Sequence, residues 1–179
     1  EVKYLTLAEA VAAVTENTTI TMLADVELTS TVTVAKGQVV TLNLNGKTIS
    51  GKYHKNDGAI IKNSGTLTIT GGTISSTGEN GGSAVMNNGT MIIEDVTLNG
   101  APNANGSWPS YTVNNTGELT IINSTITSYH GAVASYGEGA VVTLKDSEID
   151  MAGIPGFTSH GIYTYENGKV IVDGGTYAN

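Results

Sequence analysis

Short runs in which apolar and polar residues alternate recur along the chain. Four of them resemble one another: NSGTLTITGGTIS from Asn63, NNGTMIIEDVTLN from Asn87, NTGELTIINSTIT from Asn115 and ENGKVIVDGGTYA from Glu166. Residues two apart in an extended strand point to the same side, so each run has one apolar and one polar face. The pattern predicts short β-strands that bury one face.

The runs return at a regular interval. An apolar pair marks the middle of each run, and its first member falls at Ile20, Val40, Leu67, Met91, Leu119, Val142 and Val170. The interval of roughly 20 to 28 residues is typical of solenoid proteins, although the leucine-rich repeat consensus is missing. Each unit contains three strand-like pieces separated by Gly, Asn or Asp, so we expect an all-β parallel β-helix with three strands per coil and about six to seven coils.

Equivalent positions in successive repeats form columns. Both members of each apolar pair are expected to point inward, and a third inward stack should contain Ile74, Leu98, Ile126, Ile149 and Tyr177. A turn column contains Gly71, Asp95, Asn123, Asp146 and Gly174, residue types that tolerate a left-handed backbone. A further column, Asn63, Asn87 and Asn115, predicts a ladder of stacked amides.

The first residues differ from the repeats. The segment 5–15 has helical periodicity, with a capping box at Thr6 and Glu9 and an apolar stripe of Leu7, Ala10, Val11 and Val14. We expect a helix that caps the first coil, coils over residues 19–179, and one β-helix domain over residues 1–179. The chain opens at Glu1 without a signal peptide, which suggests a piece of a longer chain with other domains.

Composition narrows the possible partners. The formal charge is −8, from 16 acidic and 8 basic residues, and no arginine is present. Without a basic run we expect no nucleic-acid partner, and without a long apolar run we expect no membrane insertion. The absence of cysteine is compatible with a bacterial exported protein. We expect an extracellular or cell-surface location.

The segments YLTLAEAVAAV, TTITMLADVELTSTVTV, GQVVTLNLNGKTISG and NNGTMIIEDVTLNG together resemble the right-handed parallel β-helix domains of the pectin-lyase-like superfamily. They are most similar to such domains in large surface proteins of bacteria. The resemblance covers nearly the whole chain and implies a single-stranded right-handed β-helix. The superfamily includes polysaccharide lyases, glycoside hydrolases, tailspikes, adhesins and spacers, so the fold does not decide the function.

Catalytic motifs of that superfamily are not found. The chain has no arginine for a lyase, and it lacks the Asp-Asp, Gly-His-Gly and Arg-Ile-Lys segments of the polygalacturonase-like hydrolases. Two carboxylate pairs, Glu94 with Asp95 and Asp146 with Glu148, fall at or beside turn positions. The sequence therefore favours a non-enzymatic role, and it predicts no catalytic residue, metal site or cofactor.

Insertions between the third strand of one coil and the first strand of the next predict a contact edge, since insertions on one side of a solenoid often form its binding face. Aromatic rings in these insertions suit sugar rings. His130 and His160 each precede a glycine that opens a first strand, so they are expected to coincide in register. The predicted ligand-binding residues are Tyr53, Trp108, Tyr129, His130, Phe157 and His160.

Three functions are compatible with these features. The first is a structural or adhesive module that contacts a glycan, or a protein of a host or cell surface, through the long-loop edge. The second is a fragment or relative of a glycan-degrading enzyme, either a lyase or a hydrolase. The third is an inert spacer stalk.

Overall fold

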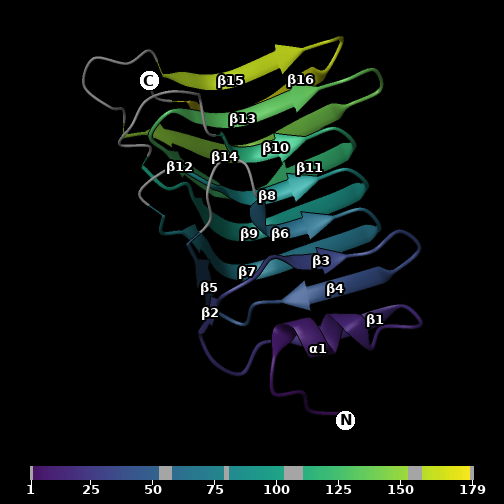
Figure 1. The fold of residues 1–179 in the computed structure, drawn as a ribbon. Coiled ribbons are helices and arrows are strands. Elements are labelled where there is room, and N and C mark those ends of the chain that lie inside the picture. Colours follow the sequence, from purple (N-terminus) through teal and green to yellow (C-terminus); the bar gives the residue numbers. More distant parts are fainter. Residues whose placement is uncertain (1, 53–57, 79–80, 103–110, 153–158, 178–179) are drawn as a thin grey trace.

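The structure is a computed structural model that describes residues 2–52, 58–78, 81–102, 111–152 and 159–177. The chain forms an all-β parallel β-solenoid of about six turns, with 62% of the described residues in strands. Figure 1 shows the coils stacked along one axis, with the N-terminal helix at one end and β15 and β16 at the other. The predicted parallel β-helix is confirmed.

The first strand of each coil belongs to a six-stranded parallel sheet. We call it the first-strand sheet, and along the solenoid it consists of β3 (Val32–Val34), β6 (Ala59–Asn63), β8 (Ser83–Asn87), β10 (Tyr111–Asn115), β13 (Gly131–Tyr136) and β15 (His160–Tyr165).

The second and third strands of the coils form one ten-stranded sheet. Its members are β1 (Thr18–Thr21), β2 (Val26–Leu28), β4 (Val39–Asn43), β5 (Thr48–Gly51), β7 (Thr66–Ser76), β9 (Thr90–Asn99), β11 (Glu118–Ile122), β12 (Thr125–Ser128), β14 (Val141–Met151) and β16 (Lys169–Tyr177).

The ten-stranded sheet bends instead of ending at the corner between the second and third strands. In β7, β9, β14 and β16 a single strand runs through this corner, so a coil has three sides but only two hydrogen-bonded sheets. One residue with positive φ makes the bend, for example Asp95 at 56° and Asp146 at 47°. Because a single left-handed residue turns the chain without breaking the ladder, the three separate strands expected in each coil merge here. The turn column is confirmed at Gly71, Asp95, Asn123, Asp146 and Gly174.

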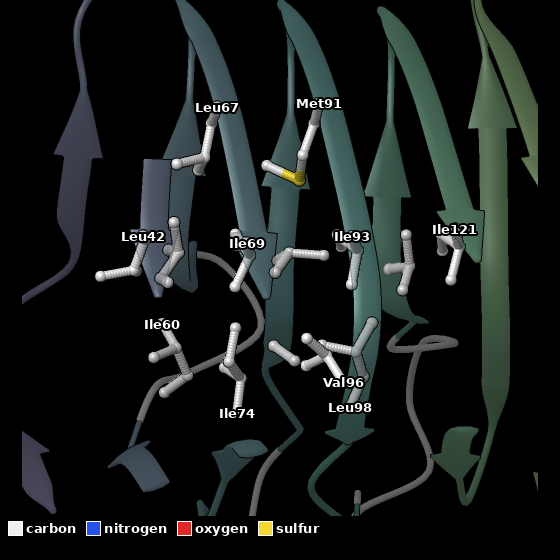
Figure 2. Close-up of a cluster of buried hydrophobic side chains, with 14 of the residues drawn as sticks. Leu42, Ile60, Leu67, Ile69, Ile74, Met91, Ile93, Val96, Leu98 and Ile121 are labelled. Carbon is white, nitrogen blue, oxygen red and sulfur yellow. The ribbon is translucent and has the colours of Figure 1, made fainter. Parts of the chain in front are cut away.

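Continuous apolar rows fill the interior. The strand register aligns Val40, Leu67, Met91, Leu119, Val142 and Val170 in one row. Figure 2 shows the next row, which includes Leu42, Ile69, Ile93 and Ile121. The predicted third stack is confirmed in register from Ile74 to Tyr177, and it is buried as far as Ile149, whereas Tyr177 is 37% exposed. Each fully buried side chain of this size contributes about 1.5 to 3 kcal/mol through removal of apolar surface from water.

One position of the predicted alignment is wrong. Ile20 pairs with Leu42, and Thr18 pairs with Val40, so Ile20 is the second member of its pair and not the first. Ile20 and Met22 are two residues apart, the same spacing as in each apolar pair. A shift by two residues leaves the same face of a strand pointing inward, so the apolar pattern alone cannot distinguish the two registers.

The asparagine ladder is confirmed at the ends of the first strands β6, β8 and β10. Asn63 Nδ2 donates to Asn87 Oδ1, and Asn87 Nδ2 donates to Asn115 Oδ1, each over 2.8 Å. Each Oδ1 also accepts the backbone N–H of the glycine two residues later, as Asn63 does from Gly65. A Cβ atom on Gly89 would lie 2.2 Å from the Gly65 carbonyl oxygen. The repeated Asn-x-Gly phrase therefore lets neighbouring coils approach closely while every amide stays paired.

The N-terminal helix α1 (Leu7–Ala12) is shorter than the predicted segment 5–15. Its capping box between Thr6 and Glu9 is present, and Leu7, Ala10 and Val11 are buried. Gln38 Nε2 donates to the carbonyls of Val11, in the last turn of the helix, and of Val14, just after it. These bonds and the contacts between α1 and β3 fix the helix on the first coil. Among the described residues no helix has the length and apolar character needed to span a bilayer.

Candidate binding surface

Five connections leave the solenoid at the same junction of successive coils, between a third strand and the next first strand. They follow β5, β7, β9, β12 and β14. The first strands that receive them start in register, since Ala59 pairs with Ser83, and Tyr111 pairs with Gly131. Their starting points therefore form a single edge (Figure 1). The predicted ligand residues Tyr53, Trp108 and Phe157 belong to these connections and lie outside the described residues.

Two predicted residues, Tyr129 and His130, lie between β12 and β13. The Tyr129 side chain is half-buried, and its carbonyl accepts a hydrogen bond from Ser159 Oγ over 3.3 Å. His130 is only 6% exposed. Burial lowers the pKa of His130, and the charge of His160 lowers it further. Burial at this corner therefore favours the neutral form of the His130 imidazole.

The predicted register of the two histidines is wrong by one residue. His160 pairs with Gly131, and its backbone N–H donates to the His130 carbonyl over 2.9 Å. His160 therefore opens β15 itself, where the sequence suggested that the following glycine would. Its exposed ring lies 6.2 Å from the ring of Tyr163, at 48°. The structure thus places His160 beside a tyrosine on the first-strand sheet.

A row of tyrosines crosses the outer side of this sheet. The rings of Tyr111 and Tyr163 have centroids 5.6 Å apart at 26°, and those of Tyr163 and Tyr165 are 6.5 Å apart at 13°. We call Tyr111, Tyr163 and Tyr165 the tyrosine row. Their exposed fractions rise along it, from 8% to 39% and then 57%. Burial, and then Tyr163, raise the pKa of Tyr111 to about 12.

Small residues make room for this row. Tyr111 and Tyr163 are separated by one strand, β13. A Cβ atom on Gly131 of that strand would lie 2.3 Å from Tyr111 Cδ1, so the Tyr111 ring lies directly over the glycine. Ala134 of β13 pairs with Tyr163. The first ring therefore reaches across a whole coil to stack on the second.

Polar side chains lie next to Tyr111. Ser83 Oγ donates to the Tyr111 carbonyl over 2.7 Å, and Asn114 Nδ2 is bonded to Ser83 Oγ and to the same carbonyl. Asn114 is half-buried. An aromatic ring beside fixed amide and hydroxyl groups is the combination that ligand sites use for orientation and specificity.

Carboxylates are distributed unevenly between the two sheets. The six strands of the first-strand sheet contain no Asp or Glu. The strands of the ten-stranded sheet carry Glu27, Glu94, Asp95, Glu118, Asp146, Glu148, Asp150 and Asp173. The tyrosine row thus lies on a carboxylate-free sheet of a strongly acidic protein.

The carboxylates that the enzyme alternative would need are part of the corner column or beside it. Asp95 and Asp146 have the left-handed backbone of the turn, and Asn123 Nδ2 donates to Asp95 Oδ1. Turn geometry accounts for these residue types. In the part of the chain that the structure describes, no three His, Cys, Asp or Glu side chains are grouped to hold a metal ion.

Sequence reasoning missed the tyrosine row because it searched the insertions. The available signal was the outward position of tyrosines in the first strands, in YTVNN of β10 and HGIYTY of β15. Two consecutive buried residues in these strands, such as Ile60 and Ile61, break the simple alternation. Their outward positions are therefore hard to assign by counting in twos.

Comparisons with family models, with curated proteins and with solved structures find no match for this chain.

Proposed function

We propose that this chain is a non-catalytic, structural and adhesive β-helix module of a bacterial surface protein, related to the pectin-lyase-like β-helices, and that it contacts carbohydrate along the edge where the connections leave. The observation that carries the proposal is the coincidence of that edge with an aromatic sheet face. All five connections enter the first-strand sheet, and the tyrosine row lies on two of its strands, β10 and β15, with β13 between them.

The architecture supports a display role. A solenoid with continuous buried rows and a buried amide ladder holds its side chains in fixed register over several coils. Such a scaffold can present a long, rigid edge to an extended polymer. Aromatic rings with nearby amide and hydroxyl groups match the alternating C–H faces and hydroxyls of a sugar chain.

A glycan array tests the proposal with two proteins, the unaltered chain and Trp108→Ala, whose mutated residue belongs to the longest insertion of the edge. We expect the unaltered chain to bind a subset of glycans and the variant to bind them at least about threefold more weakly, the loss of roughly one aromatic contact. Absence of binding to every glycan would contradict the carbohydrate role and favour an inert spacer. Release of shortened or unsaturated sugar products would favour the enzyme alternative.

A further inference from the structure

We propose that the tyrosine row is itself a glycan site, specific for neutral chains of pyranose rings, with Tyr163 and Tyr165 as the contact rings and Tyr111 as the ring that positions them. This inference rests on the proposed function and deepens it, because it moves the main contact from the insertions to the outer face of β10, β13 and β15.

The packing of the row indicates that it is organised before any ligand arrives. Tyr111 is almost fully buried and is fixed over Gly131, and its ring stacks on Tyr163. Tyr163 in turn stacks on Tyr165 at 13°. A tyrosine has only two side-chain torsions to immobilise, and here most of that entropy is already lost on folding. A site of this kind gains affinity because binding orders little more.

The two contact rings lie where a ligand can reach them. Tyr163 and Tyr165 are 39% and 57% exposed in β15, the edge strand of the first-strand sheet, where Ile162 is 38% exposed as well. Their outward rings do not fill the solenoid interior, which the apolar rows occupy. Exposed aromatic groups that are stacked and held in place are typical of contact surfaces.

Charge decides which class of ligand fits. A cationic ligand, such as a quaternary ammonium group, would gain from aromatic rings but also from nearby carboxylates. The strands of the first-strand sheet have none, and the carboxylate that follows the row in the chain, Glu166, lies in the turn after β15. An acidic glycan would be repelled at long range by the net charge of −8. An uncharged glycan is not repelled by the net charge and needs no nearby carboxylate. Its rings stack by their C–H faces, and its hydroxyls bond to polar groups.

Polar side chains lie near the row. The half-buried Asn114 amide is held by bonds from Nδ2 to Ser83 Oγ and to the Tyr111 carbonyl, and Ser83 itself is buried. His160 lies beside Tyr163 on the other side. A sugar chain stacked on the exposed rings would therefore pass an imidazole and a fixed amide within the same face.

The experiment is isothermal titration of the full chain with neutral hexasaccharides of β-glucan, mannan, xylan and galactan, with polygalacturonate and choline as charged comparators. We expect at least one neutral oligosaccharide to bind. Tyr163→Ala and Tyr165→Ala should each weaken it about tenfold, as expected for loss of an aromatic anchor. Tyr163→Phe, which keeps the ring, should bind within about threefold of the unaltered chain. Ile171→Ala is the matched control, because Ile171 is an exposed residue of the same last coil on the other sheet.

The outcomes separate this inference from the proposed function. Loss of binding in Trp108→Ala with no change in Tyr163→Ala and Tyr165→Ala would overturn the tyrosine-row site and leave the loop-edge function standing. Binding of choline or polygalacturonate alone would overturn the assignment to neutral glycans. Failure of every neutral oligosaccharide and of polygalacturonate to bind would overturn both. Circular dichroism of each variant checks that the fold is retained. The Tyr163→Phe variant stays informative because it keeps the ring and its packing.

Discussion

The buried asparagines show how much a single residue type can specify in this solenoid. The Asn87 side chain makes five hydrogen bonds that reach both neighbouring coils and its own turn. None of its polar atoms can reach water if a partner is removed. Residues of this kind are costly to replace because several buried partners lose their bonds at once.

We therefore predict that Asn87→Ala destabilises the protein by about 2 to 4 kcal/mol, because it leaves buried amide and carbonyl groups unpaired. Urea unfolding followed by circular dichroism measures the change. Asn88→Ala is the matched control, since Asn88 is exposed and accepts one hydrogen bond from Thr116. Its effect should stay within about 0.5 kcal/mol. Equal effects of the two substitutions would refute the structural importance of the ladder.

A second residue-scale prediction concerns pH. The folded pKa of His130 lies below its ordinary value of 6.5, chiefly because of burial and secondly because of the charge of His160. Between these two pKa values the unfolded chain binds more protons, so stability rises with pH. The contribution is complete above about pH 7 and is lost as the pH falls toward the folded pKa.

Urea midpoints measured from about pH 7.5 down to about pH 5 test this prediction. His130→Gln should flatten the decline, whereas His160→Gln should flatten it less, because the charge of His160 is the smaller cause. A decline of the same steepness in His130→Gln would show that other groups control the acid sensitivity.

At the scale of elements, the helix and the corners show what local sequence can and cannot specify. The capping box at Thr6 and Glu9 was readable because its spacing is local. The merging of the second and third strands could not be read from the sequence, because one left-handed residue can either end a strand or bend it. In β7 and β9, and again in β14 and β16, the pairing continues on both sides of the corner, so the strand bends there without ending.

Register between elements was the least predictable feature. The apolar rows were predictable from Leu67 onward because each strand repeats the same phrase. The error at Ile20 arose because the strand can shift by two residues without changing which face is apolar. The error at His130 and His160 arose because the insertions before them differ in length, so the sequence does not fix which residues face each other. The tyrosine row depends on that same register, since Tyr111 and Tyr163 meet only after β13 is placed between them.

The capping role of α1 gives an element-scale prediction. Val11→Asp puts an unpaired charge on the buried side of the helix, so it should detach the helix and expose the first coil. Open solenoid ends associate through unpaired strands, so light scattering should show higher oligomers. Ala8→Asp is the matched control, because Ala8 lies on the exposed side of the same helix near its N-terminus. Oligomers in both variants, or in neither, would contradict the capping role.

At the scale of the whole molecule, the acidic residues in strands all belong to the ten-stranded sheet, and the first-strand sheet has none. The strands of one sheet thus carry no carboxylate in an acidic protein, although Glu138 and Glu166 lie in the turns after β13 and β15. The composition gave the total charge but not its distribution, because the distribution follows from which strand of the coil each residue joins.

The charge pattern makes a further prediction about acidic glycans. Repulsion by the net charge acts over a distance comparable to the Debye length, about 10 Å at 0.1 M salt. Any binding of polygalacturonate should therefore strengthen as salt rises from about 0.02 to 0.3 M, whereas binding of a neutral oligosaccharide should change little. Titrations at the two salt concentrations measure this. An affinity for polygalacturonate that falls with salt would indicate a basic site, contrary to this account.

The most direct test of the tyrosine-row site is amide hydrogen exchange, measured with and without the neutral oligosaccharide that binds most tightly. Binding at the tyrosine row should slow exchange of the backbone amides in β10, β13 and β15 and leave those in β9, β11 and β14 unchanged. Protection confined to the ten-stranded sheet, or no protection in any first strand, would contradict it.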